Sequence, residues 1–256
     1  MKTKIKKAIL KITPDFVYEK YRNAKTNKHV TIYNKNSKFI KYSNNYKKVS
    51  VIVPNYNYEH YIEERIDSIL FQTYPIYELI ILDDKSTDNS VEKIEQIIKK
   101  HQEIKIKFIK NEKNSGSVFS QWQKAFSLAK GDYVWICEAD DSCNKDFLKN
   151  VMLGFNDKDV VLSYAESMRI DENNRIISPS CRDWMLAVSK TKWNKSYIND
   201  GAEEIKDALA VCNTIPNVSA VVFKKSNQIE VIEQAKRFKI SGDWYVYYQL
   251  LSKGKI

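Results

Sequence analysis

The chain has 256 residues, of which 43% are hydrophobic and 29% charged, and its formal net charge is +10. This composition excludes a natively disordered protein, because disordered chains lack the apolar surface that offsets the entropy cost of ordering. No apolar run approaches the roughly 18–20 residues of a membrane-spanning helix, and the N-terminus lacks the pattern of a secretory signal, so we expect a cytoplasmic protein.

The positive charge lies in the first 48 residues, which hold 14 basic and 2 acidic side chains. A nucleic-acid-binding module should instead pair basic with aromatic residues on the folded body, so nucleic acid is not an expected partner. Apolar residues at helical spacing predict a short amphipathic helix in this basic arm: Ile5, Ala8, Ile9, Ile12 and Phe16. One interpretation is peripheral attachment of residues 1–48 to the anionic inner membrane face. A helix packed on the body and a disordered tail are the alternatives.

From residue 49 onward, apolar strands alternate with segments of helical periodicity. Strands are predicted at residues 49–54, 78–84, 104–111 and 132–141, and helices at 58–72, 90–100 and 117–129. This alternation is typical of a parallel sheet with helices on both faces. The predicted fold class is therefore α/β, with a Rossmann-like, mostly parallel, doubly wound sheet.

The pattern is weaker after residue 145. Helices are predicted at residues 146–155, at 202–209 and after Gly242, and strands at 160–170 and 218–225. The four cysteines form no C-x-x-C pair and have no histidine at metal-binding spacing, so we expect reduced structural thiols.

Acidic residues follow two of the predicted strands. The second strand ends in Asp83 and Asp84, and the fourth runs into Glu138, Asp140 and Asp141. Open parallel sheets bind ligands at the carboxyl ends of their strands, although an Asp pair by itself is more often a turn or cap. Three carboxylates after a buried strand repel one another unless a cation lies among them. A Mg²⁺ or Mn²⁺ ion completed by substrate phosphate and water would satisfy them.

The six glycines form neither a dinucleotide-binding fingerprint nor a P-loop, which argues against dinucleotide oxidoreductases and P-loop enzymes. The string VSVIVPNYNYEHYIEERIDSILFQTYPIYELIILDDKSTDNS, followed by GDYVWICEADD, resembles the nucleotide-binding half of family 2 glycosyltransferases, which have the GT-A fold. The resemblance implies an inverting transferase that moves a sugar from a nucleoside-diphosphate sugar to an acceptor. The expected base is uracil, and the expected acceptor is a saccharide or lipid-linked saccharide of a surface polysaccharide or glycolipid.

The resemblance also divides the chain and assigns its nucleotide-binding residues. Residues 1–48 would be an arm and linker, 49–145 the nucleotide-sugar-binding half and 146–256 the acceptor-binding half. Pro54 and Tyr56 would line the base and ribose pocket. Asp84 would accept a hydrogen bond from the nucleobase, Asp83 would support its loop, and Glu138 would contact the ribose or the hydration shell of the metal.

The remaining roles lie closer to the transferred sugar. Asp140 would contact the metal, because Glu138-Ala139-Asp140 occupies the place of the family's D-x-D motif. In the segment SGDWYVYYQLLSKG, the family's catalytic base maps to Asp243, which would take a proton from the acceptor hydroxyl. Asp141, Ser219 and Trp244 would contact the donor or acceptor sugar.

Three departures from the family pattern bear on activity. Glutamate replaces aspartate at the first D-x-D position, Gly242 stands where many relatives carry an acid, and residues 117–130 contain no arginine for the diphosphate. The sequence also ends on what resembles the start of another strand, before the family's closing segment. A noncatalytic or truncated nucleotide-sugar-binding domain is therefore the alternative. A nucleotidyltransferase is less consistent with the sequence, because the loop NYNYEHY lacks glycine and basic residues.

Overall fold

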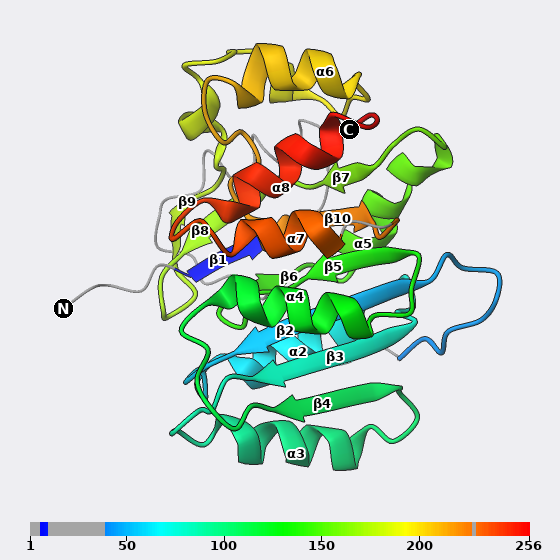
Figure 1. Ribbon diagram of the computed structural model, residues 1–256, viewed down its shortest axis with the longest axis vertical. Coiled ribbons are helices and arrows are strands. Elements are labelled where there is room, and N and C mark those ends of the chain that lie inside the picture. Colours follow the sequence, from blue (N-terminus) through cyan, green and yellow to red (C-terminus); the bar gives the residue numbers. More distant parts are fainter. Residues whose placement is uncertain (1–5, 10–38, 227–228) are drawn as a thin grey trace.

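The computed structural model describes residues 6–9, 39–226 and 229–256, and its centre is a six-stranded sheet (Figure 1). The strand order is β4-β3-β2-β5-β10-β7. Its strands are β2 (Val49–Asn55), β3 (Glu78–Asp83), β4 (Ile106–Lys110), β5 (Tyr133–Ile136), β7 (Leu162–Tyr164) and β10 (Val221–Lys224). The first four are parallel, and β10 is antiparallel to both of its neighbours. The predicted mostly parallel sheet is confirmed.

Helices cover both faces of this sheet (Figure 1). On one face lie α2 (Ile62–Leu70), α3 (Ser90–Lys100) and α5 (Phe147–Met152), and on the other α4 (Val118–Leu128), α7 (Ile229–Ala235) and α8 (Gly242–Leu251). Successive residues of a strand point to opposite faces, so Val51 packs in the first apolar core and Ile52 in the second. This explains why β2 is a continuous apolar run, and why the sheet is doubly wound as predicted.

A second, four-stranded sheet lies beside the carboxyl end of β5. Its order is β6 (Ser142–Cys143), β1 (Lys6–Ile9), β8 (Ser167–Ile170) and β9 (Ile176–Ser178). β1 pairs parallel with β6 and antiparallel with β8. The predicted amphipathic helix is therefore wrong for Lys6–Ile9, because backbone pairing with two strand edges overrides the local periodicity; the rest of that prediction lies outside the described residues.

The helices and strands in the second half of the chain are shorter and more interrupted than the sequence pattern predicted. The single strand expected at 160–170 is split into β7 and β8, because the chain leaves one sheet for the other near Ala165, whose N–H still bonds the Ala220 carbonyl at 3.0 Å. The helix α6 (Gly201–Glu204) continues as a π-turn over Ile205–Leu209, and α7 and β9 were not predicted. Short 3₁₀ turns occupy Gly154–Asn156, Arg182–Met185, Lys192–Asn194 and Val218–Ala220.

The strand expected at the end of the sequence is represented by one parallel bridge between Val160 and Lys255. All four cysteines are free, and Cys137, Cys143 and Cys181 are buried. In the described part of the chain, no helix combines the length and apolar character needed to cross a bilayer.

Candidate functional site

Hydrogen bonds join the carboxyl ends of β2 and β3 and the loops that follow them. Asp83 is 1% exposed and accepts bonds from the Asn55 amide at 2.8 Å and from the Ser86 backbone N–H at 2.9 Å. The Ser86 hydroxyl also donates to Asp83 and accepts a bond from the Asn57 N–H at 3.0 Å. Asp83 therefore fixes the turn after β3, and its support of a nucleotide-binding loop stays a prediction.

Asp84 connects the carboxyl end of β3 to the loop before α4. Its carboxylate accepts bonds from the Asn111 amide at 2.8 Å, the Ser115 N–H at 2.9 Å and the Ser115 hydroxyl at 2.8 Å. A carboxylate has about four acceptor positions, so a nucleobase would share this carboxylate with two loop residues. The predicted base contact of Asp84 stays a prediction, and the geometry adds that its orientation is already fixed.

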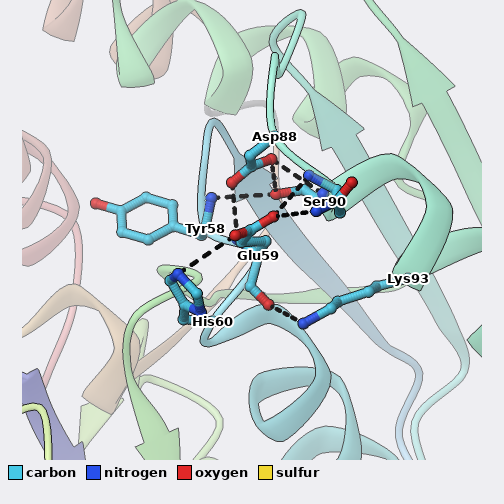
Figure 2. A network of polar contacts seen from close by, with 7 residues as sticks. Tyr58, Glu59, His60, Asp88, Ser90 and Lys93 are labelled. Carbon is cyan, nitrogen blue, oxygen red and sulfur yellow. Dashed lines mark hydrogen bonds and ion pairs between the residues drawn. The ribbon is translucent and has the colours of Figure 1, made fainter.

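A polar network joins the loop after β2 to the start of α3 (Figure 2). The Glu59 N–H donates to Asp88 at 2.9 Å, the Glu59 carboxylate accepts the Asn89 N–H at 2.8 Å, and Lys93 donates to the Glu59 carbonyl at 2.7 Å. Burial opposes ionisation of Asp88, but hydrogen bonds from Ser90 and Glu59 hold its pKa below the ordinary value. The side chain that caps the Asn89 N–H at the start of α3 thus comes from another loop, and the network holds Tyr58 in place.

The acidic segment after β5 faces Tyr58. The Tyr58 hydroxyl is hydrogen-bonded to the Asp140 side chain, and its pKa is raised by burial and by the charges of Asp140, Glu138 and Asp141. Glu138 is held by its N–H, which donates to the Ser219 hydroxyl at 2.9 Å, and by the Trp122 indole, which donates to its carboxylate at 3.3 Å. The structure therefore brings the three predicted acids together, and the aromatic side chains of Tyr58 and Trp122 contact them.

Burial and two neighbouring carboxylates act on Glu138. Burial, followed by the charges of Asp140 and Asp141, raises the pKa of Glu138 to about 8. A carboxyl that burial and neighbouring like charges keep protonated is a common feature of functional sites.

The donor set fits a divalent cation that takes most of its ligands from a substrate. Among the described residues, no three His, Cys, Asp or Glu side chains converge into a protein cage. Mg²⁺ and Mn²⁺ sites at phosphates need only one or two carboxylates, the remainder being water and phosphate oxygens. Asp140, whose carboxylate is hydrogen-bonded to the Tyr58 hydroxyl, is the carboxylate that would hold such an ion.

Asp243 lies in the first turn of α8, and Ser241 rather than Asp243 is the N-cap residue. The Asn213 amide donates to the Asp243 carboxylate at 3.3 Å. Tyr247, one helical turn further on, has its pKa raised by burial, by Asp243 and by Glu138. The carboxylates of Asp243 and Glu138 thus lie within electrostatic reach of one hydroxyl, although 105 positions separate them along the chain.

The other predicted site residues differ in accessibility. Tyr56 is 45% exposed at the end of β2, whereas Pro54 is buried within that strand. Ser219 is fully buried and holds the Glu138 N–H. The Trp244 indole donates to the Leu209 carbonyl at 3.0 Å, so one edge of this ring is engaged in packing. Contacts of these four residues with a sugar or base stay predictions.

Sequence patterns did not identify several residues that shape this site. Trp122 and Tyr58 contact the acidic segment, and Ser115 and Asn111 hold Asp84. The signal for Tyr58 was its place two residues after Tyr56 in the loop that follows β2. Ser115 lies in the loop before α4, beside Gly116, which has a positive φ of 66°.

The model of the family described as "Glycosyl transferase family 2" matches residues 50–215. The chain is 40% identical over 101 residues to a putative teichuronic acid biosynthesis glycosyltransferase, TuaG, of Bacillus subtilis, covering 40% of this chain and 39% of the relative. It is 37% identical over 106 residues to the poly(ribitol-phosphate) beta-N-acetylglucosaminyltransferase TarS of Staphylococcus aureus, covering 40% and 18%. A crystal structure of S. aureus TarS 1-349 in complex with UDP-GlcNAc has 33% identity and a TM-score of 0.41, covering 45% of this chain and 33% of that one. The chain thus spans about two fifths or less of the length of these relatives.

Proposed function

Because the chain belongs to glycosyl transferase family 2, with the GT-A arrangement of its mostly parallel sheet, we propose that it is an inverting glycosyltransferase. It transfers a sugar from a nucleoside-diphosphate sugar, with UDP as the expected carrier, to a saccharide acceptor of a surface polysaccharide or glycolipid. The named relatives support this acceptor class, since one belongs to teichuronic acid biosynthesis and another acts on poly(ribitol-phosphate).

The proposed reaction is a single displacement at the anomeric carbon. The acceptor oxygen forms the new bond as the bond between the anomeric carbon and the diphosphate oxygen breaks, and Asp243 takes the proton of the acceptor hydroxyl. The nucleoside diphosphate leaves with the bonding electron pair. A divalent cation at Asp140, when bound, would stabilise the charge on the diphosphate. Asn213 orients the Asp243 carboxylate through the 3.3 Å hydrogen bond.

One observation carries the proposal most directly, namely that Asp243 and Glu138 both act on Tyr247. An inverting transfer needs its base on the acceptor side, opposite the leaving diphosphate, yet within one substrate's length of the donor site. The shared influence of the start of α8 and the end of β5 on Tyr247 supports this placement. The two come from the parts of the chain that the sequence predicts to bind the acceptor and the donor.

Calorimetric titration with UDP, GDP, CDP and dTDP, each with and without Mn²⁺, tests the donor site. We expect one nucleotide to bind in a Mn²⁺-dependent manner in the wild type and to lose that dependence in Asp140→Ala, because the cation would lose its protein carboxylate. Binding of none of the four would contradict the nucleotide-sugar proposal. Equal, metal-independent binding in both proteins would contradict the metal role alone.

Peripheral attachment through residues 1–48 is a separate part of the proposal. It is supported by the 14 basic side chains of that segment, since each basic residue near an anionic surface adds about 1 kcal/mol of attraction. Sedimentation with vesicles containing anionic lipid should be lost when residues 1–48 are deleted, and should weaken with salt. Equal sedimentation of both chains would show that the arm is not the anchor.

The alternative, a noncatalytic nucleotide-sugar-binding domain, predicts the same titrations. The two differ only in turnover, and the release of nucleoside diphosphate in the presence of acceptor separates them.

A further inference from the structure

Arg65 is a fully buried arginine in the middle of α2, and its surroundings are unusual for a charged side chain. Its exposed fraction is 0%, and none of its three guanidinium nitrogens has a hydrogen-bond partner of ordinary geometry among the described residues. A buried charge without partners is costly, because it loses its hydration and gains nothing in return. A residue that persists in such a place needs a compensating interaction.

The groups around the guanidinium identify that interaction. The guanidinium carbon lies 5.4 Å from the ring centre of Trp135, on the strand that leads into the acidic segment. The thiols of Cys137 and Cys143 lie next to it, and Asp141 acts on it by its charge. Thiols are weak acceptors, and burial raises the pKa of both of them, so they stay neutral. Asp141 is then the negatively charged side chain that acts on Arg65.

The influence is mutual and extends to a second carboxylate. The Arg65 charge favours ionisation of Glu138, against the burial and the two neighbouring acids that oppose it. Asp141 is itself only 5% exposed, so water screens its interaction with Arg65 poorly. The positive charge of Arg65 therefore acts on two of the three carboxylates, those of Glu138 and Asp141.

We propose that Arg65 is a positioning residue for the acidic segment, a permanent internal counter-charge that acts on the Glu138 and Asp141 carboxylates before substrate arrives. The counter-charge offsets part of the repulsion within the acidic segment. It also limits how tightly a cation is held, because the guanidinium repels it. This last consequence rests on the proposed metal role of Asp140, whereas the charge coupling itself does not.

A double-mutant cycle in EDTA tests the coupling without metal or substrate. Urea unfolding midpoints are compared for the wild type, Arg65→Met, Asp141→Asn and the double variant. Asp141→Asn is expected to lower the midpoint in the wild type, because it leaves the buried guanidinium uncompensated. In the Arg65→Met background it should leave the midpoint unchanged or raise it, because it then relieves repulsion. Equal shifts in the two backgrounds would overturn the proposal.

Arg65→Met alone could be too unstable to purify, and the cycle remains decisive in that case. The proposal then predicts that adding Asp141→Asn restores a cooperative transition, since the remaining acids repel less. A double variant that folds no better than the single one would assign Arg65 a purely structural packing role.

Mn²⁺ binding in the presence of the bound nucleotide, measured from the electron paramagnetic resonance signal of free Mn²⁺, tests the functional consequence. The dissociation constant should fall at least about threefold in Arg65→Met at low salt and stay within about twofold in Arg65→Lys, which keeps the charge. Lys100→Met, an exposed one-charge loss at the end of α3, is the control. Unchanged Mn²⁺ affinity in Arg65→Met would separate Arg65 from the cation site. If the wild type binds no Mn²⁺, the proposed metal role of Asp140 is refuted instead. The double-mutant cycle would still test the charge coupling between Arg65 and Asp141.

Discussion

Asp243→Asn is expected to lower the rate of sugar transfer by about 10²–10⁴-fold, which is the usual contribution of a general base. Asparagine keeps the shape of the side chain and the first turn of α8, but it cannot take the acceptor proton. The Asn213 amide donates to this carboxylate, and the N-cap residue of α8 is Ser241, so the substitution leaves the N-cap residue unchanged. Nucleotide affinity should remain within about twofold of wild type, because the site at β2, β3 and β5 is untouched.

The measurement is release of nucleoside diphosphate in the presence of acceptor, with nucleotide binding followed separately. Asp132→Asn is the matched control, because Asp132 is exposed at the opposite, amino end of β5. A variant that keeps more than about one tenth of wild-type turnover would exclude Asp243 as the base. Loss of both turnover and nucleotide binding would show a structural role for Asp243 rather than a chemical one.

The first half of the fold was predictable because it is governed by local patterns. In β2 and β3 every residue is buried, so each strand is mostly apolar, and the helix between them has clear periodicity. In the second half, long-range contacts determine where the strands begin and end. The predicted strand at 160–170 breaks because its two parts pair with different partners, β10 and β1, and no property of the segment itself records that change of sheet.

The candidate site shows the same division. The acids at 83–84 and 138–141 were found because open parallel sheets bind ligands at the carboxyl ends of their strands and because the segments around them resemble family motifs. Their partners could not be found in this way. Trp122 packs in the second apolar core, and Glu59 caps α3 from a loop 30 residues earlier. Folding brings these residues next to the acids, and this proximity in space cannot be read from the sequence.

Glu138→Gln is expected to stabilise the metal-free protein at alkaline pH, by about 1–3 kcal/mol at pH 8.5 and by nothing near pH 4. Burial, Asp140 and Asp141 raise the folded-state pKa of Glu138 from 4.5 to about 8. Between these values the folded protein holds a proton that the unfolded chain has lost. The wild type therefore loses stability as the pH rises through this window, and a glutamine cannot ionise. Each pKa unit corresponds to about 1.4 kcal/mol, and we discount the full shift because the side chain is partly exposed to water.

Urea unfolding in EDTA at pH 5, 6.5 and 8.5 measures this difference, with the exposed Glu92→Gln on α3 as the control. The gain should grow with pH for Glu138→Gln and stay flat for the control, and parallel pH profiles would contradict the raised pKa. Glutamine keeps the oxygen that accepts the Trp122 indole bond, so packing is preserved. Added Mn²⁺ and nucleotide should remove the gain, because a cation near the acidic segment favours the ionised form of Glu138. The stability cost of this carboxylate in the empty site would then be the reason that the site binds a cation together with its substrate.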